Sequence, residues 1–210
     1  MNSSANLSSK PSAPAPSEVP TFRLTNEKLN DTTLVCDALR IRYRVAKENG
    51  VIRVYRRSEA SQQEVLVAEW WQRSIRKDTF RFPQQSGLVS QGVPSSRFIP
   101  KTGGHRGTST FDRTYQAEDG RRYVWRCRED ELACRPVDDM YRGNGSPVAV
   151  SERKRIGLTK TSLQTTIELF PGYERILDSL VVTYLYVERR RRKGKRNNIL
   201  IQVASSLAGA

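Results

Sequence analysis

Hydrophobic and polar residues alternate in short runs along much of the chain between residues 21 and 170, and Gly, Asn, Asp and Pro separate these runs. Such alternation predicts half-buried β-strands, because successive side chains of a strand point to opposite faces. The clearest runs predict a hairpin over residues 39–57 with its turn at residues 48–50. Further strands are expected at residues 64–72, 79–82, 110–116, 122–127, 131–135, 148–152 and 165–170. This spacing predicts an antiparallel, mainly β domain.

Residues 176–187 follow a different pattern, in which only Asp178, Ser179 and Thr183 are polar. A helix without a polar face must be enclosed by protein. The β-branched and aromatic residues here also fit a buried strand. We favour a helix because Asp178 suits a helix N-terminus, the basic run that follows suits a C-terminus, and Gly194 supplies a stop. The apolar part is shorter than the about 20 residues that a membrane span needs, so no transmembrane segment is predicted.

The rest of the chain divides by composition. Residues 1–20 are rich in Ser, Ala, Pro and Asn and are expected to form a disordered leader without a signal peptide. Residues 21–196 are expected to form one domain, with a long surface loop over residues 83–107. The tail, residues 197–210, is mildly apolar, and both docking and fraying are compatible with its sequence.

The chain is strongly basic, with 36 Lys and Arg residues against 22 Asp and Glu residues and a formal net charge of +14. This charge favours a polyanionic partner: anionic membrane lipid, a nucleic-acid backbone or an acidic protein. The three cysteines, Cys36, Cys127 and Cys134, form no CxxC pair and leave an odd thiol. That pattern indicates an intracellular protein, cytoplasmic or nuclear, and not a secreted one.

Two groups of basic residues are candidate anion-binding sites. Arginines on the predicted hairpin could hold phosphate groups through bidentate contacts, and the competing interpretation is an ordinary solvated strand face. They are Arg40, Arg42, Arg44 and Arg53, together with Arg56 and Arg57.

The second group is the basic run RRRRKGKR that follows the apolar segment over residues 189–196. Its candidate site residues are Arg189, Arg190, Arg191, Arg192 and Lys193. So dense a charge is expected to re-emerge into water or to meet an anionic partner. It could contact anionic lipid, at about 1 kcal/mol per basic residue, serve as a nuclear address, or simply be a solvated helix end. No base-reading motif occurs, so any nucleic-acid contact is expected to be to the backbone and salt-dependent.

Catalytic and metal-binding chemistry finds little support. His105 is the single histidine, and the cysteines lack the close spacing of a structural zinc site. No GxSxG motif occurs, and Gly103, Gly104 and Gly107 lack the spacing of a phosphate-binding P-loop. We therefore expect no catalytic residue, no metal and no cofactor.

Several large or charged residues are expected to have structural roles. Trp70, Trp71 and Trp125 could line a ligand site, but tryptophans on alternating strands usually pack in or beside the core. Glu69 lies on an otherwise apolar strand, and a buried carboxylate needs a cationic partner. We expect that partner to be an arginine.

The order of these motifs resembles a family. The hairpin IRYRV…GVIRVYRR, the strand VLVAEWW, the strand pair TFDRTYQAEDGRRYVWR and the ending LDSLVVTYLYVERRRRK are similar to the fungal domain-of-unknown-function family grouped with the tubby-like C-terminal and LURP-one-related folds. The resemblance covers residues 22–196. It implies an antiparallel, about twelve-stranded tubby-like β-barrel that encloses a hydrophobic C-terminal helix.

Relatives with that fold include binders of membrane phosphoinositides and proteins that resemble phospholipid scramblases, but no lipid-binding motif can be matched here position by position, and fold does not fix function. The leading hypothesis is a non-enzymatic binding module that contacts anionic phospholipid or another polyanion through its basic surface. The alternative is a protein-interaction or structural module whose basic run is a nuclear-localisation signal.

Overall fold

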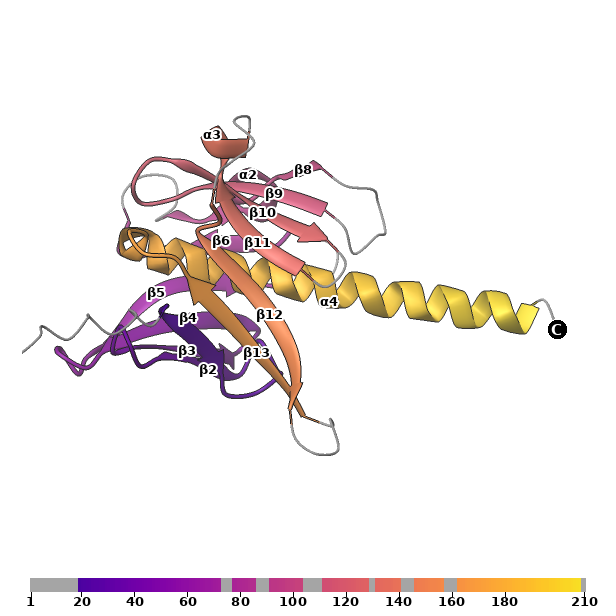
Figure 1. Ribbon diagram of the computed structural model, residues 1–210, viewed down its shortest axis with the longest axis horizontal. Coiled ribbons are helices and arrows are strands. Elements are labelled where there is room, and N and C mark those ends of the chain that lie inside the picture. The colour runs from indigo at the N-terminus through magenta and orange to yellow at the C-terminus, as the bar shows by residue number, and fades with distance from the viewer. Residues whose placement is uncertain are drawn as a thin grey trace, which may run out of the picture.

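The computed structural model describes residues 19–72, 77–85, 91–103, 111–128, 131–140, 146–156 and 162–208. The predictions for residues 1–18, His105, Gly104 and Gly107 lie outside these ranges. Within them the protein is mainly β, with one large antiparallel sheet and a long C-terminal helix (Figure 1). The mainly β prediction is thus confirmed.

Thirteen strands form the sheet. Their bounds are β1 (Thr21–Leu24), β2 (Thr32–Cys36), β3 (Ile41–Glu48), β4 (Val51–Ser58), β5 (Glu64–Trp71), β6 (Thr79–Arg81), β7 (Val93–Pro94), β8 (Lys101–Gly103), β9 (Phe111–Gln116), β10 (Arg122–Arg128), β11 (Glu131–Pro136), β12 (Ala149–Ile156) and β13 (Ser162–Leu169). The helices are α2 (Ser95–Phe98), α3 (Val137–Met140), the 3-10 turn η1 (Glu174–Ile176) and α4 (Leu177–Ala208).

The sheet consists of two antiparallel meanders joined at their first and last strands. One runs from β1 to β7 and the other from β8 to β13, and β1 pairs with β13, with Phe22 opposite Ile167. The outermost strands are therefore β7 and β8. These two strands are neighbours along the chain, because only α2 and the residues beside it separate them. The chain itself thus links the two edges of the sheet.

Within the expected surface loop over residues 83–107, the described residues 91–103 form β7, α2 and β8 and pack partly against the core, which corrects the prediction for this part; residues 86–90 and 104–107 lie outside the described ranges. Val93 and Ile99 are buried. The Ser95 N–H donates to the Asp78 carbonyl at 2.7 Å, and Arg113 Nη1 donates to the Ile99 carbonyl at 2.8 Å. Alternation missed this segment because its apolar residues are few and spread among Gly, Ser and Pro. These hydrogen bonds hold the link between β7 and β8 where no continuous ladder of strand hydrogen bonds forms.

The hydrogen-bonded sheet is not closed between β7 and β8, and it has thirteen strands where twelve were expected. The predicted hairpin over residues 39–57 is confirmed as β3 and β4. Its turn has Asn49 at φ 49° and Gly50 at φ 80°. An Asn-Gly pair tolerates these left-handed conformations and matches the twist of the flanking strands.

The sheet curls around helix α4 and surrounds its first half. Every residue from Ser179 to Glu188 is buried, so no side of this segment faces solvent. Two internal polar groups are satisfied: Trp125 Nε1 donates to Thr183 Oγ1 at 2.8 Å, and Ser151 Oγ donates to Tyr184 Oη at 3.2 Å. The prediction of an enclosed helix is confirmed, and the alternative of a buried strand is wrong.

The predicted helix stop at Gly194 is also wrong, because α4 continues to Ala208 and its last part extends beyond the sheet (Figure 1). One glycine costs a helix about 1 kcal/mol, too little to end one that its enclosed first half already holds in place. The tail from residue 197 to residue 208 therefore has helical backbone.

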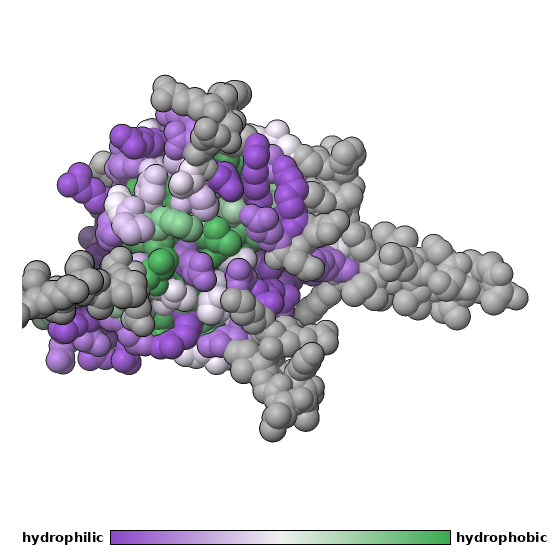
Figure 2. Space-filling view, viewed as in Figure 1, coloured by the Kyte–Doolittle hydropathy of each residue, from purple (hydrophilic) through white to green (hydrophobic). Residues whose placement is uncertain are grey.

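The surface of the described residues is largely polar. Figure 2 shows hydrophilic residues surrounding a hydrophobic centre on the face in view. Yet among the described residues the only exposed large hydrophobic side chain is Val19, at 45%. The function of this part of the chain is therefore best sought among charged side chains.

Candidate functional site

The N-terminal end of α4 is held by polar residues from both meanders. Asp178 accepts hydrogen bonds from Tyr43 Oη at 2.6 Å and from Arg56 Nη1 at 2.9 Å. On the other side Glu118 accepts from the backbone N–H of Ser179 at 2.8 Å and from its hydroxyl at 2.5 Å. Desolvation at the helix end raises the pKa of Glu118. These residues therefore fix the start of the helix.

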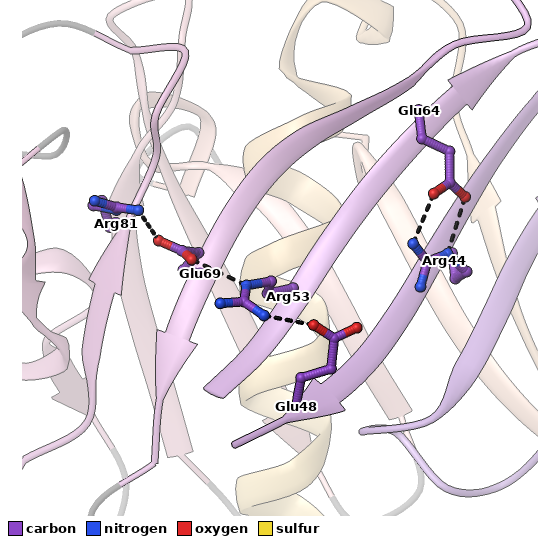
Figure 3. Close-up of polar contacts among 6 residues, drawn as sticks. All are labelled: Arg44, Glu48, Arg53, Glu64, Glu69 and Arg81. Atoms are coloured by element: carbon purple, nitrogen blue, oxygen red, sulfur yellow. Dashed lines mark hydrogen bonds and ion pairs between the residues drawn. The ribbon is translucent and has the colours of Figure 1, made fainter. Parts of the chain in front are cut away.

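The outer face of β3, β4 and β5 carries arginines that are matched by glutamates (Figure 3). Arg44 donates to both carboxylate oxygens of Glu64, at 2.9 and 2.7 Å. This hydrogen bonding raises the pKa of Arg44 and lowers that of Glu64. Arg53 donates to Glu69 at 3.1 Å and to Glu48 at 2.5 Å. Two of the predicted anion-binding arginines are thus occupied by carboxylates of the protein.

The other hairpin arginines have separate positions. Arg56 faces inward and pairs with Asp178 at 2.9 Å, so it belongs to the helix end and not to the outer face. Arg40 is exposed just before β3 and has φ 53°. Arg42 and Arg57 are exposed and directly opposite each other on β3 and β4. The structure therefore does not gather the six hairpin arginines into one site.

Glu69 has the arginine partners that the sequence required. Its side chain is only 6% exposed, and it pairs with Arg53 and Arg81. The tryptophans behave as packing residues: Trp70 and Trp125 are buried, and the Arg81 guanidinium lies 5.7 Å from the ring centroid of Trp71. The structural interpretation of these residues is confirmed.

The basic run begins inside the sheet, not beyond it. Arg189 lies over the ring of Trp70 at 5.3 Å, and Arg190 lies over the ring of Tyr186 at 5.2 Å and 3.5 Å from Asp78. Burial lowers the pKa of Arg189. Of the two expectations for this run, re-emergence into water or contact with an anionic partner, the first is met only in part: Arg191 is buried, Arg189, Arg190 and Arg192 are half-buried, and Lys193 is exposed.

Glu188 and Arg191 form an enclosed ion pair with side chains 0% and 2% exposed, and their oxygen and nitrogen are 2.7 Å apart. Burial by itself lowers the pKa of Arg191, but the charge and hydrogen bond of Glu188 outweigh it, so the net direction is upward. Arg192 donates to the other oxygen of Glu188 at 2.6 Å and also to the Glu27 carbonyl. Arg191 is thus a structural cation, while Arg192 is oriented toward the rim and Lys193 is exposed.

A groove of about 680 Å³ lies where α4 leaves the sheet. Three elements supply its basic side chains: the connection between β1 and β2, strand β12 and helix α4. Its charged lining contains six cationic residues and one acidic residue, Glu27. The cationic residues are Lys28, Arg153, Arg189, Arg192, Lys193 and Lys195.

Two residues that line the groove have guanidinium nitrogens with unused hydrogen-bonding capacity. Arg153 Nε and Arg192 Nη2 are buried and have no hydrogen-bond partner among the described residues. A buried guanidinium N–H without an acceptor is costly, and phosphate oxygens would satisfy it. The groove can therefore hold an anion with several oxygens.

Three of the predicted site residues, Arg189, Arg192 and Lys193, line this groove. Sequence reasoning missed Lys28 and Arg153. They lie far from the basic run in sequence and reach it only through the pairing of β1 with β13 and of β13 with β12. Lys195 belongs to the basic run over residues 189–196 but was not among the five candidate site residues.

The three cysteines, Cys36, Cys127 and Cys134, are buried. Burial raises the pKa of the Cys127 thiol to about 11 and that of the Cys134 thiol to about 12. No three His, Cys, Asp or Glu side chains of the described residues gather as metal ligands. Among the helices of the described chain, none has the length and apolar character needed to cross a membrane.

Comparison with known proteins gave one match. The matching family model carries the description Family of unknown function (DUF6593) and aligns with residues 27–193, from the first residues that line the groove to the end of the basic run. No curated protein and no solved structure matched significantly. Because the match spans well over half of the 210 residues, the chain belongs to this family of unknown function.

Proposed function

We propose that this protein is a non-enzymatic binding module that holds the phosphate groups of an anionic phospholipid, or of another polyanion, in the groove at the exit of α4. The observation that carries the proposal is the charge of the groove, six cationic residues against one acidic residue. The contrast with the outer face supports it, because the described lining of the groove carries an excess of positive charge, and such an excess in a recess attracts anions.

The arrangement of the groove favours a ligand with more than one phosphate. Glu188 fixes the Arg192 guanidinium in the helix wall, whereas Lys193 is exposed and free to adjust. A planar, oriented guanidinium suits bidentate contact with phosphate oxygens, and ammonium groups add charge without strict geometry. A volume of about 680 Å³ falls in the range of small-molecule sites and accommodates a phosphorylated headgroup.

The resemblance to the tubby-like and LURP-one-related folds supports the phospholipid version of the proposal, at the level of fold. We infer a barrel in which the segment with α2 completes the wall between β7 and β8. Members of such folds contact phosphoinositides, but no functional residue is transferred from them here. The proposal rests on the groove.

The alternative of a nuclear address has weaker support. A receptor must reach the basic run, but Arg191 is buried with Glu188, and Arg189, Arg190 and Arg192 contact the protein. Replacing the run by alanine in a fluorescent fusion separates the two hypotheses, because an address predicts a redistribution between nucleus and cytoplasm and lipid contact predicts loss from membranes. A protein or nucleic-acid partner would use the same groove through its negative charge.

Liposome sedimentation tests the proposal. The full chain should sediment with vesicles that contain phosphoinositide and not with neutral vesicles, and binding should weaken as salt rises. The variant Lys28→Gln/Arg153→Gln/Lys193→Gln should lose most of this binding. The control Lys47→Gln/Arg97→Gln/Arg122→Gln removes the same charge from residues outside the groove lining and should retain it. Equal behaviour of the two variants would overturn the groove as the site.

A further inference from the structure

A second recess lies near the opposite end of the enclosed part of α4. It has a volume of about 340 Å³ and is lined by Arg42, Arg57, Glu59 and Gln62. These residues belong to the start of β3, the end of β4 and the connection to β5. None of them lines the groove at the helix exit. The recess is therefore a separate place on the molecule.

Arg42 and Arg57 face each other across β3 and β4 without a carboxylate between them. They are direct partners in the strand register, both are exposed, and neither forms an ion pair or side-chain hydrogen bond with another described residue. Like charges directly opposite each other destabilise a sheet. Glu64 is opposite Arg57 in register on β5, but both of its oxygens accept hydrogen bonds from Arg44, and Arg57 adds only a smaller electrostatic contribution to the lowered pKa of Glu64. Arg44 and Arg53 thus have directly bonded carboxylates, whereas Arg42 and Arg57 have none among the described residues.

Two non-glycine residues beside the recess adopt left-handed backbone conformations, which are unfavourable for such residues. Arg40 has φ 53° and Gln62 has φ 50°, and these are two of the three non-glycine residues with positive φ in the described chain. The conformations are held by hydrogen bonds from the Glu59 N–H to the Arg40 carbonyl at 3.1 Å and from the Gln62 N–H to the Ser58 carbonyl at 3.0 Å. Left-handed backbone at such residues is uncommon and tends to occur at functional sites.

We propose that this recess binds the phosphate group of a small phosphorylated molecule that has a neighbouring hydroxyl group. Arg42 and Arg57 donate to the phosphate oxygens, which removes the repulsion between the two guanidinium groups. Glu59 would repel a second anionic group and instead accepts from the hydroxyl, while the Gln62 amide can donate or accept beside it. The recess therefore selects one phosphate with a polar, uncharged body, in contrast to the polyanion of the groove.

Glycerol 3-phosphate has these features and serves as the probe, with inorganic phosphate as the comparison. A calorimetric titration of the full chain should show binding of glycerol 3-phosphate. The variant Arg42→Gln/Arg57→Gln should bind it about tenfold more weakly or worse, since two charge-assisted contacts are lost. The variant Lys47→Gln/Arg122→Gln has the same net charge and leaves the recess intact, so its affinity should stay within about twofold of wild type. Equal weakening in both variants, or none in the first, would overturn the proposal.

Two further variants sharpen this result. Glu59→Gln should strengthen binding of inorganic phosphate, because the carboxylate that repels the anion is removed. It should also reduce the preference for glycerol 3-phosphate, because the carboxylate that accepts from the ligand hydroxyl is lost. If it leaves that preference unchanged, the role of Glu59 is wrong. The groove variant Lys28→Gln/Arg153→Gln/Lys193→Gln should bind glycerol 3-phosphate normally while losing vesicle binding, so failure of one site is distinguished from failure of the other. A loss of glycerol 3-phosphate binding in the groove variant would contradict a separate recess.

Discussion

The outer face of β3–β5 and the exit of α4 are both rich in arginine, yet their charges are balanced in different ways. On the outer face Arg44 and Arg53 pair with carboxylates of neighbouring strands. At the helix exit Glu188 pairs with Arg191 and Arg192, and Glu27 is the only acidic residue among the described residues that line the groove beside them. Arginine density alone therefore does not identify a binding surface, because strand register decides whether a carboxylate is within reach.

The largest effect is expected from Glu188→Gln, which removes the carboxylate that pairs with the buried Arg191 at 2.7 Å. Loss of one partner of a buried ion pair typically costs about 3–5 kcal/mol, because an uncompensated charge stays inside. Urea unfolding measures this loss. The double variant Glu188→Gln/Arg191→Met should recover part of the stability. A loss of less than about 1 kcal/mol in the single variant would show that the exit is more hydrated than the burial of Arg191 indicates.

On the outer face the comparable change is Glu69→Gln, and its effect should be smaller. Glu69 is buried, but its partners Arg53 and Arg81 are 30% and 43% exposed and can regain water. We expect a loss of about 1–3 kcal/mol in free energy of unfolding. Thermal and urea unfolding of this variant beside Glu188→Gln ranks the two regions, and a larger loss for Glu69→Gln would reverse the comparison.

Removing carboxylates should also make the outer face resemble the groove. In Glu48→Gln/Glu64→Gln, Arg44 loses its carboxylate partner and Arg53 retains only Glu69, so one positive charge is released for each carboxylate removed. When these changes are added to the groove variant, vesicle binding should recover by about 1 kcal/mol for each freed charge. Sedimentation with phosphoinositide vesicles measures the recovery. If none occurs, charge balance is not what separates the two faces.

A single exposed groove residue separates binding from stability. Lys193→Gln should weaken vesicle binding by about 1 kcal/mol, roughly fivefold, while unfolding changes by less than about 0.5 kcal/mol. Lys47→Gln is the control, because Lys47 is exposed at the end of β3. Parallel losses of binding in both variants would indicate a general effect of net charge.

The smallest effect is the acid dependence of the Arg44–Glu64 pair. The hydrogen bond from Arg44 lowers the pKa of Glu64 in the folded state, so the pair contributes stability above the ordinary pKa of a glutamate. That contribution is lost as pH falls from the ordinary value through the lowered one. Because both side chains are about 40% exposed, Glu64→Gln should flatten the acid limb of the stability curve only slightly. A pronounced flattening would mean that the pair contributes more to the free energy of unfolding than an exposed ion pair is expected to contribute.

Local patterns predicted the parts of the fold that depend on local chemistry. Alternation and an Asn-Gly turn identified the β3–β4 hairpin, and the lack of a polar face identified the enclosed helix. The need of Glu69 for an arginine followed from the cost of a buried carboxylate. Its actual partners, Arg53 and Arg81, follow from register across β4, β5 and β6, which a single sequence does not contain.

The site was harder to predict, because it depends on how far the sheet extends along α4. The basic run was expected in water, whereas the strands reach past Glu188 and bury Arg191. Arg153 comes to the groove through the pairing of β12 with β13, and nothing in the strand around it marks it as different from neighbouring basic residues. Long-range strand pairing therefore determines which residues line the groove and which of them are buried.

Lysine footprinting with an acylating reagent, read by mass spectrometry, tests the central claim most directly, because each region contains exposed lysines. Lys28 and Lys193 lie in the groove, and Lys47 lies at the end of β3. With phosphoinositide vesicles present, Lys28 and Lys193 should become protected while Lys47 keeps its reactivity, and neutral vesicles should protect none of the three. Protection of Lys47 with continued reactivity of Lys28 and Lys193 would contradict the assignment of anion binding to the exit of α4.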